Sequence, residues 1–178
     1  MSVDHYEWRL TMNSTVKGNK LVLERVFQAP VELVFQAYSE PDRLEKWWGP
    51  EGWETKVKTF EFMPNGVWHY GMTCVDEDMG EFYGMQSWGL GIFQSIEPMK
   101  RIQYKDMFSD AEGMVNEQLP MIDIDLRFIP EGKETRLVIE SEFESEAELQ
   151  KLLEMQVIEG MTSQFTCLDE YLSKVKMH

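Results

Sequence analysis

The feature that most constrains this chain is a long series of segments in which apolar and polar residues alternate. From Glu54 to Phe143 the apolar residues recur with a period of two, as in strands with one buried and one wet face. The connections between these segments are short, and Asn65-Gly66 is a strong signal for a tight hairpin. Short connections favour antiparallel neighbours, so the pattern predicts an antiparallel sheet of about six or seven strands, counting the strand expected near residues 21–27.

One long helical pattern follows the last strand, over residues 146–175. Ser145 can cap its first turn. Apolar or small residues, and one glutamine, then recur at steps of three and four: Leu149, Leu152, Leu153, Gln156, Gly160, Met161, Phe165, Leu168 and Leu172. A sheet with one apolar face needs a cover, and a helix of about eight turns is the only element of that size. We therefore expect an α+β fold in which a strongly curved sheet wraps around this helix and leaves a cavity in the gap.

Two short helices are expected after the first core strand, near residues 31–38 and 42–48. Three of the six tryptophans, Trp47, Trp48 and Trp53, fall at the end of the second one. Gly49 suits the position after a helix, and the proline that follows it prevents continuation. The cluster has three interpretations: a clasp that packs the short helices onto the sheet, a lid over the cavity mouth, or a surface for a protein partner. We favour the clasp.

The first twenty residues form an N-terminal extension to this pattern. Apolar residues alternate from Tyr6 to Met12, which predicts an extra strand, and Gly18-Asn19 offers a turn. No internal repeat or low-complexity stretch interrupts the chain. Residues 1–178 are therefore expected to form one domain.

Composition limits the partners of the chain. It has 32 Asp and Glu against 17 Lys and Arg, a net charge of −15, so neither nucleic acid nor a membrane surface is an expected partner. A hydrophobic share of 43% argues against disorder. There is no run of eighteen apolar residues, no basic-then-apolar leader and no disulfide framework, since Cys74 and Cys167 are the only cysteines. A cytoplasmic location is expected.

Three stretches of the sequence carry a family resemblance: RVFQAPVELVFQAYSEPDRLEKWWGPEGW, NGVWHY and EGMTSQFTCLDEYL. Together they resemble the helix-grip (START-like, SRPBCC) superfamily, which includes the birch-pollen-type allergen. More narrowly, residues 21–172 are similar to the bacterial branch named after the activator of the heat-shock-90 ATPase. The resemblance implies the helix-grip fold. Proteins of this fold bind lipids, hormones, polyketides and other apolar molecules, and some are cyclases or hydrolases, so the fold alone does not fix the function.

The candidate ligand site is the gap between the sheet and the long helix. Trp68, Tyr70 and Met72 share one face of a strand, which is either plain core or a pocket wall. The predicted ligand-binding residues are Trp48, Trp68, Tyr70, Met72, Ile92, Tyr104, Ile122, Ile124, Gln156, Gly160 and Met161. Gly160 either allows close packing of the helix on a strand or leaves the cavity floor open. A closed apolar cavity of roughly 300–1,000 Å³ would favour ligand binding.

The sequence shows few patterns that are typical of a catalytic site. The histidines His5, His69 and His178 lie far apart in the sequence, so we expect neither a metal site nor a cofactor. The alternation of Asp123 and Asp125 with apolar residues places both on the wet face. We assign no catalytic residues, although Asp106 and Glu140 are conceivable acids or bases.

The sequence favours non-enzymatic binding of a small apolar or amphipathic molecule. A second interpretation is a protein-interaction module of co-chaperone type, with a protein partner or a second copy of the chain bound near Trp47 and Trp48. A third is an enzyme of the cyclase or hydrolase kind. Buried polar residues with perturbed pKa values would favour the enzyme.

Overall fold

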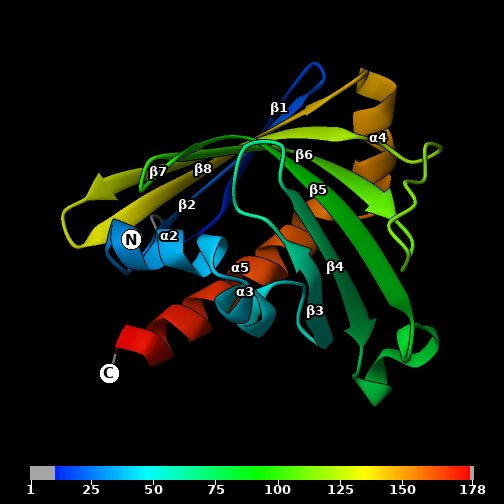
Figure 1. The fold of residues 1–178 in the computed structure, drawn as a ribbon, viewed down its shortest axis with the longest axis horizontal. Helices are drawn as coiled ribbons and strands as arrows, with labels where there is room; N and C mark the ends of the chain where they lie inside the picture. Colours follow the sequence, from blue (N-terminus) through cyan, green and yellow to red (C-terminus); the bar gives the residue numbers. More distant parts are fainter. Residues whose placement is uncertain (1–10, 177–178) are drawn as a thin grey trace, which may run out of the picture.

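The computed structural model describes residues 11–176 and is built on one antiparallel sheet (Figure 1). Its strands are β1 (Asn13–Lys17), β2 (Lys20–Phe27), β3 (Trp53–Phe60), β4 (Val67–Cys74), β5 (Gln86–Glu97), β6 (Arg101–Ser109), β7 (Ile122–Glu131) and β8 (Glu134–Phe143). They lie in the order β1-β2-β8-β7-β6-β5-β4-β3. The described residues thus give eight strands, against the six or seven predicted for the sheet without the N-terminal extension.

The additional strand is β1, in the N-terminal extension. It pairs with β2 in antiparallel register across the turn at Gly18-Asn19, where Gly18 has a φ of 60°. The alternating stretch from Tyr6 to Met12, for which the sequence predicts a strand, lies almost entirely outside the described residues. An edge strand with every residue exposed carries no apolar alternation, and this explains why β1 escapes a pattern search.

In the described part of the chain, four α-helices accompany the sheet: α2 (Val31–Ser39), α3 (Pro41–Trp47), α4 (Glu146–Glu154) and α5 (Val157–Lys176). The two short helices confirm the prediction from the first half of the sequence. A 3₁₀ segment, η1 (Glu77–Phe82), lies between β4 and β5. Within residues 11–176 none of the helices combines the length and apolarity that crossing a bilayer requires. Figure 1 shows α5 running obliquely across the curved sheet, beside α3.

The C-terminal helical pattern is broken, which corrects the prediction of one continuous helix. The side chain of Ser145 caps α4 as expected, by accepting a hydrogen bond from the Glu148 N–H. Gln156, however, has a φ of 62°, and a right-handed helix cannot continue through a left-handed residue. The N–H of Gly160 donates to the Gln156 carbonyl and so starts α5. The apolar spacing crosses the break because both helices pack on the core, so periodicity alone does not reveal it.

Aromatic side chains fill the space between the inner face of the sheet and the helices. Trp68 is 3% exposed and lies against Trp48 and Phe93, with ring centroids 4.7 and 6.2 Å away. Tyr70 lies directly over Gly89 of the neighbouring strand, where an added Cβ would come within 2.5 Å of its ring and hydroxyl. Gly89 is thus required for Tyr70 to lie flat on the sheet, and Tyr70 is part of the site described next.

Candidate ligand-binding site

The tryptophan pair at the end of α3 is a structural clasp. Trp47 is 2% exposed, and its indole N–H donates to the Ala37 carbonyl of α2 at 3.0 Å. The carbonyl of Trp48 accepts a hydrogen bond of 2.7 Å from the Thr55 hydroxyl on β3. The N–H of Gly49 donates to the Gln164 side chain on α5 at 3.0 Å. This segment therefore joins both short helices, the edge of the sheet and the long helix.

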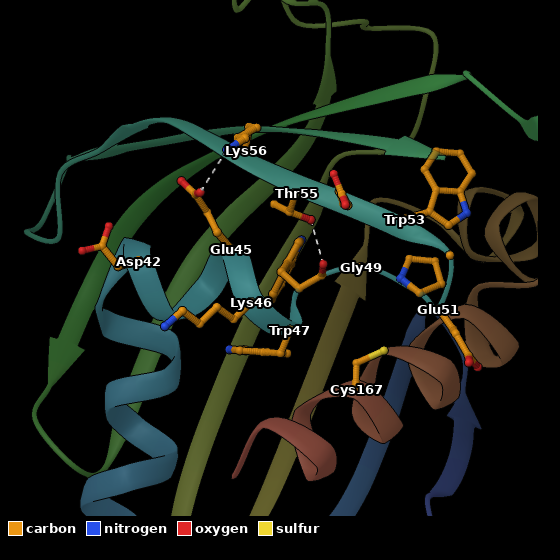
Figure 2. A pocket seen from close by; sticks show the side chains of 14 residues that line it. Asp42, Glu45, Lys46, Trp47, Gly49, Glu51, Trp53, Thr55, Lys56 and Cys167 are labelled. Atoms are coloured by element: carbon orange, nitrogen blue, oxygen red, sulfur yellow. Dashed lines mark hydrogen bonds and ion pairs between the residues drawn. The ribbon is translucent and has the colours of Figure 1, made fainter. Parts of the chain in front are cut away.

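An open groove lies on the solvent side of this clasp (Figure 2). Its volume is about 840 Å³, and it is bounded by α3, the turn after it, the start of β3 and Cys167 of α5. Glu45 and Lys56 face each other across it at 4.0 Å. Burial, together with the charges of Glu170 and Glu51, raises the pKa of the Cys167 thiol, which disfavours a reactive thiolate. The groove offers solvated charges and no desolvated site for chemistry.

The inner cavity lies between the sheet and the start of α5 and has a volume of about 90 Å³. Its walls are mostly apolar: Leu21, Leu23, Trp48, Ile122, Ile124, Leu126, Ile139, Phe143, Leu152, Val157 and Met161. Four polar residues also face it: Tyr38, Tyr104, Asp106 and Ser141. A mainly apolar wall with a few converging polar groups is the usual composition of a small-molecule site.

The outer cavity adjoins it and has a volume of about 50 Å³. Tyr70 and Met72 of β4, Ser87 of β5 and Phe108 of β6 contribute to its walls. It is closer to the solvent, since the last three of these residues are only partly buried.

Asp106 is the one carboxyl group that lines the two cavities among the described residues, and its environment is strongly perturbed. Burial raises its pKa to about 7, against the opposing effect of hydrogen bonds from the Met107 N–H and the Tyr70 hydroxyl. Burial also raises the pKa of Tyr70, as does the nearby charge of Asp106, while a hydrogen bond from Trp48 acts in the opposite direction. Trp48, Tyr70 and Asp106 thus lie next to one another in the core.

Two polar atoms at the inner cavity are left without a partner. Asp106 is only partly buried as a residue, but its Oδ1 atom is excluded from solvent and meets no donor among residues 11–176. The hydroxyl of Tyr38 is also buried and unpartnered within that part of the chain. Buried polar atoms almost always have a hydrogen-bond partner, so two exceptions around one cavity make this cavity the candidate ligand site.

Comparison with known proteins identifies the family to which this fold belongs. The model of the family "Activator of Hsp90 ATPase homolog 1-like protein" matches residues 28–173. The chain belongs to this family. No curated protein sequence matches the chain. The resemblance stated from the three sequence stretches, and with it the helix-grip fold, is confirmed.

Solved structures of bacterial proteins share the fold over nearly the whole chain. One from Arthrobacter aurescens is 30% identical, with a TM-score of 0.82, and the match covers 93% of this chain and 92% of that one. Protein Ms6760 from Mycobacterium smegmatis is 27% identical, with a TM-score of 0.78 and coverage of 89% and 93%. One from Staphylococcus epidermidis is 26% identical, with a TM-score of 0.77 and coverage of 92% and 94%.

The structure of this family member brings together most of the predicted ligand-binding residues. Five of them line the inner cavity: Trp48, Tyr104, Ile122, Ile124 and Met161. Tyr70 and Met72 line the outer cavity, together with Ile122. Their role in binding stays a prediction, but they share one continuous region of the core.

The other four predicted residues lie outside both cavities. Trp68 is enclosed by other aromatic rings. Ile92 is on the outer face, because the inner positions of β5 are taken by Gly89 and Gly91. Gln156 is exposed at the helix break, where its left-handed backbone turns it away from the sheet.

Gly160 is the fourth, and it neither packs closely nor lines the cavity. A Cβ added there would meet no atom within 4 Å, so the close-packing interpretation is wrong. Gly160→Ala should therefore raise the free energy of unfolding by about 0.5–1 kcal/mol through helix propensity alone, measured by urea unfolding. Gly89→Ala is the matched control and should destabilise, because its Cβ would collide with Tyr70. A loss of stability in Gly160→Ala would contradict the open space.

The sequence named Asp106 only as a conceivable acid or base, and neither Asp106 nor Tyr38 was among the predicted ligand-binding residues. In β6, Asp106 shares its face with Ile102 and Tyr104, so alternation alone places a carboxyl on the apolar side. Tyr38 shows no such signal, since an aromatic residue on the buried stripe of a helix is ordinary core. Residues 11–176 contain no group of three His, Cys, Asp or Glu side chains arranged to hold a metal ion.

Proposed function

We propose that this protein binds a small apolar or amphipathic molecule in the inner cavity, without catalysing a reaction. The unpartnered Asp106 Oδ1 and Tyr38 hydroxyl, facing one mainly apolar cavity, are the observation that supports this function. An unpaired buried polar atom costs about 1–3 kcal/mol. A ligand that offers hydrogen bonds to these two atoms would recover that free energy while it buries its own apolar surface.

The volume of the site limits the size of the ligand. The volume of the inner cavity is about 90 Å³, which is well below the roughly 300–1,000 Å³ that is typical of ligand pockets and that we expected from the sequence. Together the two cavities approach the ~150 Å³ of an engineered apolar cavity that takes up benzene. A single ring or a short alkyl chain with one polar group fits this space. Val157 is the first residue of α5 after the helix break and Met161 lies one turn further on, so the start of α5 forms one wall of the cavity.

An enzymatic role has less support. Hydrolysis by general acid and base needs a second ionisable partner beside the carboxyl group. No histidine, cysteine, lysine or second carboxylate is found among the described residues that line the inner cavity. A single carboxyl group beside Tyr70 suits the recognition of a polar group better than it suits catalysis.

A protein-interaction module is the second candidate, at a different place from the one that the sequence suggests. Trp47 and Trp48 are 2% and 8% exposed, so they offer no surface to a partner. The connection between β4 and β5 instead exposes Phe82, Tyr83 and Met85 to about half of their surface. This patch favours association with a protein or a second copy of the chain. Sedimentation of the parent and of Phe82→Ser would show whether the patch drives self-association.

Binding in the inner cavity is tested by filling it. Ser141 is 8% exposed and lines the cavity, so Ser141→Leu should occupy most of the free space. Ser173→Leu, on the exposed side of α5, is the matched control. In NMR titrations with benzyl alcohol, the parent and Ser173→Leu should show saturable shifts of cavity residues, and Ser141→Leu should show none. Saturable binding that survives in Ser141→Leu would contradict this location for the site.

A further inference from the structure

The inner and outer cavities meet at one pair of residues. Asp106 on β6 and Ile122 on β7 are partners in the antiparallel register. Both side chains line both cavities, and no other residue of the described chain does so. A ligand that extends from one cavity into the other must therefore pass beside the Asp106 carboxyl group.

The Asp106 carboxyl group presents an unpartnered oxygen at this junction. Tyr70 and Met107 lie close enough to the carboxyl group to affect its pKa, and its Oδ1 atom is buried without a hydrogen-bond partner. Tyr70 lies over Gly89 and beside Trp48, whose ring centroid is 5.7 Å away. Oδ1 is thus a buried acceptor with no donor in the described part of the chain.

No positive charge offsets this acceptor. The titratable groups that face Asp106 are phenols: Tyr70 on β4, Tyr104 on the same strand and Tyr38 on α2. Burial raises the pKa of all three, so they are neutral near pH 7. No lysine or arginine is found among the described residues that line either cavity. A bound amine would supply the missing charge, and a hydroxyl would supply the missing donor.

We propose that Asp106 selects ligands that carry a hydroxyl or amine group on a single ring or short chain, and that it excludes carboxylates. The apolar part lies in the inner cavity, and the donor lies at the junction, against Oδ1. This inference rests on the proposed function and adds the chemical class of the ligand. A carboxylate would bring a second negative charge to a site with no counter-charge, in a protein whose net charge is already −15.

Three ligands with the same ring test the selection: benzylamine, benzyl alcohol and benzoate. At pH 8 the parent protein should bind benzylamine at least about tenfold more tightly than benzoate, with benzyl alcohol between them. In Asp106→Asn, benzylamine should lose about tenfold in affinity, whereas benzyl alcohol should stay within about threefold because the amide oxygen still accepts. The dissociation constants are measured by NMR titration.

Asp123→Asn is the matched control. It removes the same charge from the exposed face of β7 and should leave all three affinities unchanged. Benzoate binding as tightly as benzylamine, or an Asp106→Asn variant with unaltered preference, would overturn the inference and leave the proposed function in place. If the parent binds none of the three ligands, the proposed function itself fails. The comparison within the parent decides the question even where the variant does not fold.

Discussion

Replacing Trp47 with alanine is expected to lower the free energy of unfolding by about 3–5 kcal/mol, since loss of a buried large side chain leaves a cavity as well as removing transfer energy. Trp47 is among the largest fully buried side chains of the described chain. Its ring lies 4.8 Å from that of Tyr38 and 5.4 Å from that of Trp48, and its N–H bonds to Ala37. The substitution would also leave the Ala37 carbonyl unpaired in the core.

For a domain of this size the melting temperature should fall by roughly 10 °C, at about 2–4 °C per kcal/mol. Trp53→Ala is the internal comparison, because Trp53 belongs to the same seven-residue cluster but is only partly buried at the groove. It should cost less than half as much. Equal losses in the two variants would show that the clasp does not depend on Trp47, and an unchanged melting temperature for Trp47→Ala would refute the clasp altogether.

The fold is predictable from the sequence because its main signals are periodic. Apolar residues alternate along β4, β6, β7 and β8, and each of these strands has one face against the helices. The Gly49-Pro50 stop ends α3 where expected, and Gly49 has a φ of 98°. The sequence does not reveal the break at Gln156, since a left-handed residue other than glycine leaves no mark in a pattern of apolar positions.

The site is less predictable than the fold, for two reasons. Large apolar residues are easy to place on the inner face, but packing decides which of them border a void and which are enclosed, as the contrast between Tyr104 and Trp68 shows. The second reason is the polar group of the site, Asp106, because a carboxyl group on the apolar face of a strand violates the usual alternation. Such local violations are expected at functional sites. In β6 the carboxyl group of Asp106 falls on the face of Ile102 and Tyr104, and this break in the alternation is the signal that assigns it to the site rather than to the wet face.

Asp106→Asn is expected to stabilise the protein above pH 7 and to do so less and less as the pH falls. The folded protein holds the Asp106 proton up to a pKa of about 7, whereas the unfolded chain releases it near ~3.9. Below pH ~4 both states are protonated, and the group has no effect on the pH dependence. Between pH ~4 and ~7 only the unfolded chain ionises, so the parent loses stability as the pH rises, and the loss levels off above pH ~7.

The size of the effect follows from the same shift. A difference of about three pKa units corresponds to a loss of roughly 4 kcal/mol for the parent at pH 8, because one unit is worth ~1.36 kcal/mol. The unpaired amide N–H group of asparagine costs about 1 kcal/mol, which leaves a net gain of about 3 kcal/mol and a rise in melting temperature of roughly 6–12 °C. Urea unfolding of parent and variant at pH 5, 6, 7 and 8 measures this difference.

Asp123→Asn is the control, because it loses only an exposed partner of Lys105. Its free energy of unfolding should differ from that of the parent by less than about 1 kcal/mol at every pH. A difference between Asp106→Asn and the parent that stays constant or shrinks from pH 5 to pH 8 would show that the Asp106 carboxyl is not desolvated, and the recognition of ligand donors at this position would lose its physical basis.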